Sequence, residues 1–286
     1  MYKVKNTVKG EFHEFDWESY QRDSYLLRNK EELNKLIEEE LVDYYFQPIV
    51  SAVDGSVFGY EALMRSRLKT IRSPLEIITL ARSQSKLYQI EHLTWFKALS
   101  AFLKSGAYAG GTRIFVNSIP NQMLSERDIR EIENLYAPLL SQLVIELTEE
   151  EKIDERCIAS KQDCAARWQA NLAMDDFGTG YNGESMLLFL SPHFVKIDIS
   201  IIHGIDSDPN RRQLLSNLLE YAHERNIQVI AEGVETREEM ETVVRAGVDY
   251  LQGYYIGTPA ESPGTPSANV QRAIQSAHTP HPTEED

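Results

Sequence analysis

QLVIEL at residues 142–147 and NLAMD at residues 171–175 are two short apolar runs, and the stretch between them has the pattern of one helix. A strand, a helix and a second strand in this order predict a parallel β-α-β unit. Acidic residues close both runs, Glu146 in the first and Asp175 with Asp176 in the second. The stretch therefore predicts an α/β fold with chemistry at its strand ends.

The same alternation continues on both sides of this stretch. Further strand-like runs occupy residues 44–50, 57–64, 112–117, 194–198, 228–231 and 249–252. Helical patterns accompany them, for instance at residues 29–41, 74–82 and 211–225. Eight strands alternating with helices over about 220 residues are the number expected of a closed, TIM-like (β/α)8 barrel, and an open doubly wound sheet is the competing architecture.

The composition excludes several classes of protein. With 42% hydrophobic and 26% charged residues among 286, the chain has globular proportions. The net charge of −15 argues against duplex nucleic acid or an anionic membrane surface as a partner. No apolar run approaches the roughly 18 residues of a membrane span, and no secretory signal is evident, so no membrane span and a cytoplasmic location are expected.

Three segments are expected along the chain. Residues 1–28 lack clear periodicity and are interpreted as an N-terminal arm of unknown role. Residues 29–260 hold the barrel and begin with a helical stripe. Residues 261–286 are rich in Pro, Ser and Thr, with a short helix at 268–277 and a mobile tail after it.

Nearly every predicted strand ends in or near a polar side chain. These residues are Glu61, Asn117, Glu146, Asp175, Asp176, Lys196, Asp198, Glu232 and Gln252. A single strand-end Glu is more often a helix cap or a solvated charge, but parallel strands of a barrel open on one mouth, so the whole set should converge there. Carboxylates about 4 Å apart repel by roughly 4 kcal/mol per pair at an effective dielectric near 20, so the set needs a cation. Oxygen ligands suit Mg²⁺ or Mn²⁺, and no Cys or His cluster indicates zinc.

The adjacent pair Asp175 and Asp176 needs a special backbone. Consecutive residues of a regular strand point to opposite faces. A turn at the strand end would let both carboxylates reach one site, and that geometry suits a bridge between two metals.

The ordered motifs resemble the EAL-domain cyclic di-GMP phosphodiesterases over about residues 29–260. The signature EALMR at 61–65 is preceded by FQPIV at 46–50. It is followed by VN at 116–117, ELTE at 146–149, DDFGTG at 175–180, KID at 196–198, AEGVET at 231–236 and QGY at 252–254. One departure is Ser118-Ile119-Pro120, where many members have Leu-Ser-Pro. The resemblance implies a modified barrel whose first strand runs antiparallel to the others.

The resemblance also implies Mg²⁺ or Mn²⁺ as cofactor, two ions per active site. The ligands of one ion would be Glu61, Asn117, Glu146 and Asp175, and those of the other Asp175, Asp176 and Glu232. The implied catalytic group is Lys196, which orients water or phosphate, with Glu232, Gln252 and the supporting acids Glu235 and Glu149. The implied substrate contacts are Gln47, Arg65 and Asp198.

The implied activity is hydrolysis of cyclic di-GMP to linear 5′-pGpG by two-metal activation of water, which lowers the level of this bacterial second messenger. A homodimer is expected by the same resemblance. Two alternatives stay open: a catalytically silent domain that binds cyclic di-GMP or a partner protein, and a metal-dependent hydrolase of another phosphodiester. Because silent members usually lose the first Glu or one of the paired aspartates, the intact set favours an enzyme.

Overall fold

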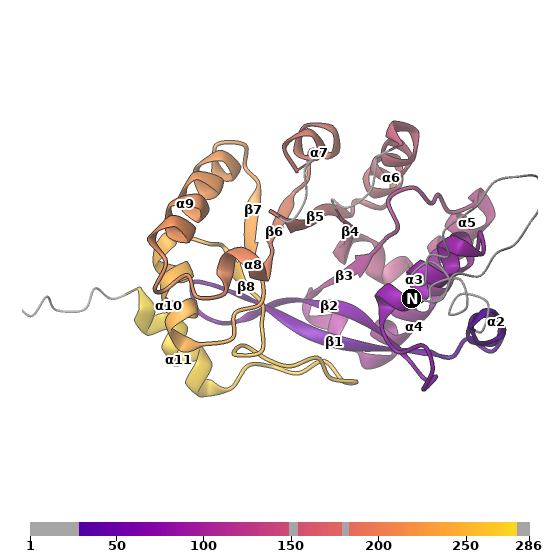
Figure 1. Cartoon of the computed structure of the whole chain (residues 1–286), viewed down its shortest axis with the longest axis horizontal. Coiled ribbons are helices and arrows are strands. Elements are labelled where there is room, and N and C mark those ends of the chain that lie inside the picture. The colour runs from indigo at the N-terminus through magenta and orange to yellow at the C-terminus, as the bar shows by residue number, and fades with distance from the viewer. Residues whose placement is uncertain (1–28, 149–153, 179–182, 279–286) are drawn as a thin grey trace, which may run out of the picture.

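Eight strands close into a barrel in chain order, from β1 to β8 (Figure 1). The computed structural model describes residues 29–148, 154–178 and 183–278. The strands are β1 Val42–Ser51, β2 Val57–Ser66, β3 Arg113–Asn117, β4 Leu143–Thr148, β5 Asn171–Phe177, β6 Phe194–Ile197, β7 Gln228–Ala231 and β8 Tyr250–Leu251. The predicted closed barrel is thus confirmed, and the open doubly wound sheet is wrong.

The first strand runs against all the others. β1 pairs antiparallel with both β2 and β8, while every pair from β2 to β8 is parallel. The cause lies in the short connection at residues 52–56, because a parallel crossover needs about a dozen residues or more and a hairpin does not. Gly55, with φ of 72°, supplies the left-handed residue of this turn. The antiparallel first strand that the resemblance implies is confirmed.

Helices surround the barrel in the described part of the chain. They are α2 Lys30–Glu38, α3 Pro74–Ser83, α4 Leu87–Ser105, α5 Glu126–Tyr136, α6 Glu155–Trp168, α7 Gly183–Leu190, α8 Ile199–Ile202, α9 Pro209–His223, α10 Arg237–Ala246 and α11 Ala268–Ala277, with short 3₁₀ turns at Ala107–Gly110 and Ala137–Gln142. Local sequence fixes several starts, since Ser73 and Thr236 each form a capping box with the Glu three residues later. The expected helices at 29–41, 74–82, 211–225 and 268–277 are confirmed, with small shifts at their ends.

The last helix belongs to the packed body of the molecule. α11 packs against α10, and the His278 ring bonds the Ala52 carbonyl in the β1–β2 connection. This contact places α11 at the end of the barrel where β1 turns into β2 (Figure 1). The predicted arm at 1–28 and the final residues 279–286 lie outside the described residues.

An apolar layer fills the barrel below its mouth. It consists of Ile49, Phe115, Val144, Ala173, Phe194 and Ile230, all at most 2% exposed. Phe58 and Tyr250 stack at 3.9 Å between ring centroids and close this layer from beneath. The barrel is therefore a packed core and not a pore, and space for a ligand is left at the mouth.

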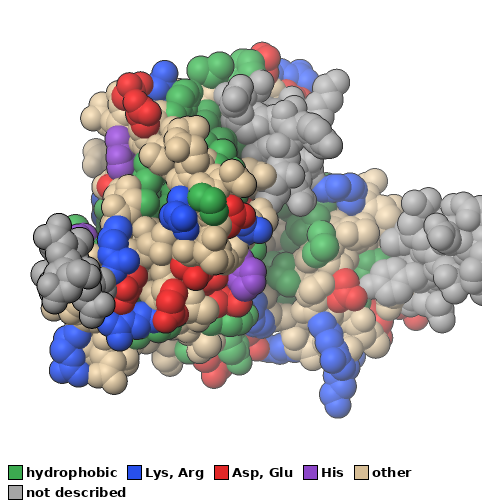
Figure 2. Space-filling model, turned by 60° about the vertical axis from the view of Figure 1, so that its left-hand side comes forward, with side chains coloured by type: hydrophobic (Ala, Val, Ile, Leu, Met, Phe, Trp, Pro, Cys, Tyr) green, Lys and Arg blue, Asp and Glu red, His purple; other side chains and the backbone are tan. Residues whose placement is uncertain are grey.

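The outer surface is strongly charged but mixed in sign. Figure 2, which turns the side bearing α9, α10 and α11 forward, shows Lys and Arg side chains interspersed with Asp and Glu. On α10, for example, Glu241 pairs with both Arg237 and Arg245. Among the described helices, none combines the length and apolarity needed to cross a bilayer.

Candidate functional site

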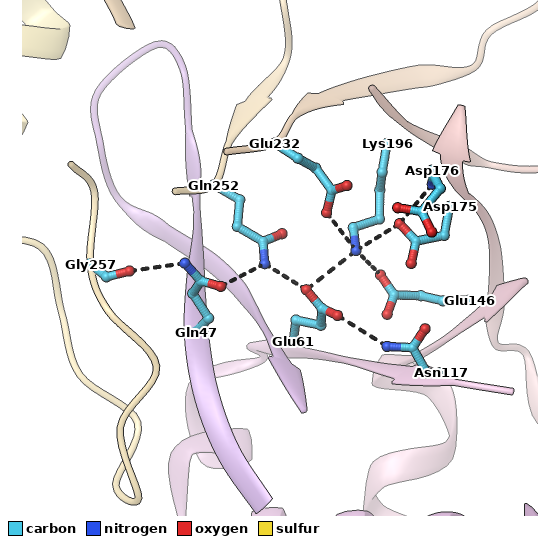
Figure 3. A network of polar contacts seen from close by, with 10 residues as sticks. All are labelled: Gln47, Glu61, Asn117, Glu146, Asp175, Asp176, Lys196, Glu232, Gln252 and Gly257. Carbon is cyan, nitrogen blue, oxygen red and sulfur yellow. Dashed lines mark hydrogen bonds and ion pairs between the residues drawn. The ribbon is translucent and has the colours of Figure 1, made fainter. Parts of the chain in front are cut away.

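A ring of polar side chains lies one step above the apolar layer of the barrel (Figure 3). Side chains two residues apart along a strand share a face, so the residues two positions toward the mouth also point inward. They are Gln47, Glu61, Asn117, Glu146, Asp175, Lys196, Glu232 and Gln252. Seven of the nine strand-end residues predicted from sequence therefore converge here, together with Gln47 from β1.

Glu61 reaches the mouth from the middle of β2. The strand runs to Ser66, but its pairing with β3 ends at Ala62. Beyond that point β2 pairs with β1 alone, as a hairpin that continues past the barrel rim. Glu61 is thus at the rim of the barrel without being at the end of its strand.

A backbone irregularity brings the two adjacent aspartates together. β5 pairs with β6 at Met174 with Val195 and next at Phe177 with Ile197, so β5 carries one extra residue there. Asp176 has φ of 56°, in the left-handed region that Asp tolerates better than most residues. The bulge lets carboxylates of consecutive residues face one site. The predicted turn of the backbone is confirmed.

Lys196 occupies the centre of the ring (Figure 3). Its Nζ lies 2.7 Å from a carboxylate oxygen of Glu146 and of Glu232, 3.1 Å from one of Asp175 and 3.3 Å from one of Glu61. The ammonium is fully buried, and buried charges persist only when they are paired. One ammonium nevertheless balances only one of the negative charges around it.

Burial and nearby charges shift the pKa values of these acids in different directions. Burial raises the pKa of Glu146 and of Glu232 well above the ordinary Glu range, and it raises the pKa of Asp175 as well. For Glu61 burial acts in the same direction, but the Lys196 ammonium and hydrogen bonds from two amides hold its pKa below the usual value. The four carboxylates in turn raise the pKa of Lys196 against the effect of burial. Without a further cation, the ring thus favours protonation of part of its acids.

Three amide side chains orient Glu61. The Asn117 Nδ2 donates to Glu61 Oε1 at 3.0 Å, and the Gln252 Nε2 donates to Glu61 Oε2 at 2.6 Å. Gln252 also donates to Gln47 Oε1 at 3.3 Å, and the Gln47 amide nitrogen donates to the Gly257 carbonyl. Because the amide nitrogens are turned toward these acceptors, Glu61 is held in one orientation.

Two groups of carboxylates have the geometry to hold metal ions. Glu61, Glu146 and Asp175 place oxygens within 4.8 Å of one another, and so do Asp175, Asp176 and Glu232. The groups share Asp175. Both oxygens of Glu146 are buried without a hydrogen-bond donor in the described residues, although Lys196 lies within ion-pair distance. An oxygen-only set with unsatisfied buried oxygens fits a hard divalent cation such as Mg²⁺ or Mn²⁺.

A cavity of about 320 Å³ opens beside this ring. Of the predicted site residues outside the ring, Asp198, Glu235 and Asp176 line it. The carboxylate of Asp198 also accepts from Ser200 N–H at 2.8 Å and so caps α8. The cavity is large enough for part of a nucleotide ligand and open to solvent on one side.

Two predicted site residues are not part of this cluster. Arg65 lies on the hairpin extension beyond the rim, where its guanidinium donates to the Met64 carbonyl and lies 5.6 Å from the centre of the Tyr45 ring. It shares a face of β2 with Glu61 but does not line the cavity. Glu149 lies outside the described residues.

The sequence reasoning missed the apolar wall of the cavity. Ile199 and Tyr254 line it, and they are 41% and 64% exposed. Tyr254 follows Gln252 and Gly253, and Gly253 lets the backbone pass so close to Val234 that a Cβ would lie 2.2 Å from its backbone atoms. The position of Tyr254, two residues after the strand-end amide Gln252, is a sequence signal that could have placed it at the mouth. No such signal marks Ile199.

Metal binding to this ring is expected to strengthen as pH rises. A divalent cation binds ionised carboxylates, and burial keeps the pKa of Glu146 and of Glu232 high, so binding must displace protons. Each displaced proton strengthens the apparent affinity about tenfold per pH unit between about pH 5.5 and the raised pKa. Calorimetric titration with Mg²⁺ in buffers of different ionisation enthalpy measures both quantities. A pH-independent affinity with no proton release would contradict the raised pKa values.

The chain is similar over most of its length to several known proteins. The sequence model of the EAL domain matches residues 30–259. The probable cyclic di-GMP phosphodiesterase PdeG of Escherichia coli is 29% identical over 234 residues, which are 77% of this chain and 45% of that protein. The chain spans about half the length of the curated relatives it matches.

Solved structures agree with the barrel. A standalone versatile EAL protein of Vibrio cholerae, in its c-di-GMP bound form, is 28% identical with a TM-score of 0.68, covering 80% of this chain and 97% of that one. The PaMucR phosphodiesterase in complex with c-di-GMP is 26% identical with a TM-score of 0.70, covering 82% and 97%.

Proposed function

The chain belongs to the EAL domain family, and from this premise we propose that it hydrolyses cyclic di-GMP to linear 5′-pGpG with two divalent cations at the barrel mouth. The observation that carries the proposal is the pair of carboxylate groups that share Asp175. A phosphodiester ligand is an anion, and this acidic mouth can hold one only when cations are bound. The names of the similar phosphodiesterases support cyclic di-GMP as that ligand.

The residues of the two groups divide between two ions. Glu61, Glu146 and Asp175, with the Asn117 amide oxygen, would hold one Mg²⁺ or Mn²⁺, and Asp175, Asp176 and Glu232 would hold the second. When bound, such ions acidify a water molecule and stabilise charge on phosphoryl oxygens during in-line attack. The observed carboxylate oxygens and their burial support this division, and the ion count is part of the proposal.

The remaining residues act on the substrate and on the ligands. Lys196, fixed by carboxylates from four strands, supplies a buried positive charge where negative charge develops on the phosphoryl group. Gln252 and Gln47 keep Glu61 oriented. We assign Asp198 and Arg65 to substrate contacts, with Arg65 reaching a phosphate from the hairpin above the mouth. The roles of Glu235 and Glu149 as supporting acids stay predictions.

Tyr254 is expected to contribute to substrate affinity more than to turnover. Its ring is 64% exposed at the cavity, where a planar guanine base could stack on it. Stacking on an aromatic side chain contributes about 1–3 kcal/mol per base. Tyr254→Ala should therefore raise KM about tenfold with kcat nearly unchanged, and Tyr254→Phe should behave like the wild type. A fall in kcat at constant KM would contradict this role.

The decisive experiment is incubation of the purified protein with cyclic di-GMP in Mg²⁺ or Mn²⁺ and, separately, in EDTA. Metal-dependent appearance of 5′-pGpG is the expected result. Binding without turnover would favour the silent receptor, and the intact carboxylate groups speak against it. Turnover of other cyclic or linear phosphodiesters at a similar rate would favour the broader hydrolase.

Assembly and location belong to the same proposal. A homodimer in the bacterial cytoplasm is what the family resemblance implies, and both stay predictions. Light scattering behind a sizing column measures the first.

A further inference from the structure

Helices α4 and α6 hold a buried ion pair outside the candidate site. Glu91 on α4 is 1% exposed and Lys161 on α6 is 7% exposed, and their charged atoms lie 3.2 Å apart. Both contact Ser118, which directly follows Asn117 at the end of β3. The Ser118 hydroxyl donates to Glu91 Oε1, and Lys161 Nζ donates to the Ser118 oxygen at 2.6 Å. Two charges are thus buried around one small residue beside a predicted metal ligand.

The Glu91 carboxylate is fully engaged. Its second oxygen accepts from the Ile119 backbone N–H at 2.8 Å, and the Trp95 Nε1–H, one helical turn away, donates to the first at 2.9 Å. With Ser118 and Lys161, four donors converge on this one side chain. Residues 118 and 119 are consequently held by side-chain hydrogen bonds from the helical layer and not only by the sheet.

The anchored residues connect directly to the ring. Successive side chains of a strand point to opposite faces, so Asn117 faces the mouth while Ser118 faces α4 and α6. The Ser118 N–H donates to the Glu146 carbonyl at 2.9 Å, and the Asn117 side chain donates to Glu61. Fixing Ser118 therefore fixes the backbone of Asn117, whose side chain contacts Glu61, and the backbone at Glu146.

We propose that Glu91 and Lys161 are positioning residues: their ion pair clamps Ser118 and Ile119 so that Asn117 stays aligned with the cation site. The inference rests on the proposed function in that it assigns Asn117 to a metal-binding ring. Outer groups that orient metal ligands typically change metal affinity about 10–100-fold when they are altered. The same order of effect is expected here, although neither residue touches the ion.

The test compares Mg²⁺ affinity of the full chain, without substrate, in matched variants. Glu91→Gln keeps the shape of the side chain and removes its charge, and we expect about tenfold weaker Mg²⁺ binding by calorimetry. The double variant Glu91→Gln with Lys161→Met removes both charges, which restores thermal stability but not Mg²⁺ affinity. Glu40→Gln is the control. It removes a surface ion-pair partner of Lys97, which lies on α4 like Glu91, and it should change neither the thermal stability nor the Mg²⁺ affinity.

A purely structural role would lower the thermal stability of Glu91→Gln and leave the Mg²⁺ affinity of every variant unchanged, and that result overturns the inference. If Glu91→Gln does not fold, the double variant and Ser118→Ala decide by the same criterion. Side-chain amide exchange of Asn117 by NMR in the metal-free protein adds a readout that needs no ion: faster exchange in Glu91→Gln is expected. Failure of the wild type to bind Mg²⁺ or Mn²⁺ would refute the proposed function, while unchanged Asn117 exchange would refute the clamp.

Discussion

Replacing Glu61 by alanine is expected to lower the proposed turnover of cyclic di-GMP about a thousandfold, equivalent to about 4 kcal/mol of transition-state stabilisation, while the protein stays folded. Glu61 accepts hydrogen bonds from Asn117 and Gln252 and pairs with Lys196, so its carboxylate links one carboxylate group to the amides that surround it. Loss of this carboxylate would remove a proposed ligand of the first ion and leave the amide donors of Asn117 and Gln252 without this acceptor.

Glu61→Gln sharpens this experiment because it preserves the volume of the side chain. A glutamine at this position supplies no anionic oxygen, so the Mg²⁺ affinity should fall together with kcat. Glu220→Gln on the exposed face of α9 is the matched control and should retain full activity. Circular dichroism and thermal unfolding establish that each variant is folded. Activity above about a tenth of the wild-type value in Glu61→Gln would rule out the metal-site assignment.

Strand periodicity explains why so much of the ring could be predicted. On β3, β4, β5, β6 and β7 the inward apolar residue is followed two positions later by Asn117, Glu146, Asp175, Lys196 and Glu232. Local alternation alone places each of these side chains toward the axis once the barrel is assumed. The convergence of the acids is therefore a property of the sequence pattern and the closed topology together.

The direction of β1 also had a local signal. The connection at 52–56 is too short for a parallel crossover, so two strands flanking it form a hairpin. Periodicity ignores connection length, which is why only the family resemblance supplied this feature. The position of Arg65 had no such local signal. The hairpin continues past the rim because β3 stops pairing with β2 at Ala62, and this end point depends on the tertiary structure.

Tertiary ion pairs could not be predicted from sequence. Glu91 and Lys161 are separated by seventy positions on two helices and follow no motif. Lys196 could be predicted as a strand-end residue, but its central contact with four carboxylates requires the closed barrel. Such contacts depend on distances between elements, and a one-dimensional pattern contains no such distances.

The second large expected effect is a loss of stability when the positive charge of Lys196 is removed. Lys196→Met leaves Glu61, Glu146, Asp175 and Glu232 without the ammonium that pairs with all four in the described structure. Breaking a buried ion pair from one side costs about 3–5 kcal/mol. For a chain of this size that corresponds to a fall in Tm of about 10 °C in EDTA. Turnover should be lost under all conditions.

Two conditions should reduce this destabilisation, and each follows from the sign of a charge. Bound Mg²⁺ replaces the missing positive charge, so the Tm difference between Lys196→Met and the wild type should shrink in excess Mg²⁺.

Lower pH should also reduce the destabilisation of Lys196→Met. Burial already raises the pKa of Glu146 and of Glu232, and loss of the ammonium raises both further, so the folded variant binds more protons than its unfolded state. Its stability then rises as pH falls toward the unfolded Glu value of about 4.3. Thermal unfolding at about pH 8 and about pH 5.5, with and without Mg²⁺, measures all four cases. Equal Tm values for variant and wild type in EDTA at the higher pH would mean that the carboxylates do not depend on Lys196, and the charge balance proposed for the ring would be wrong.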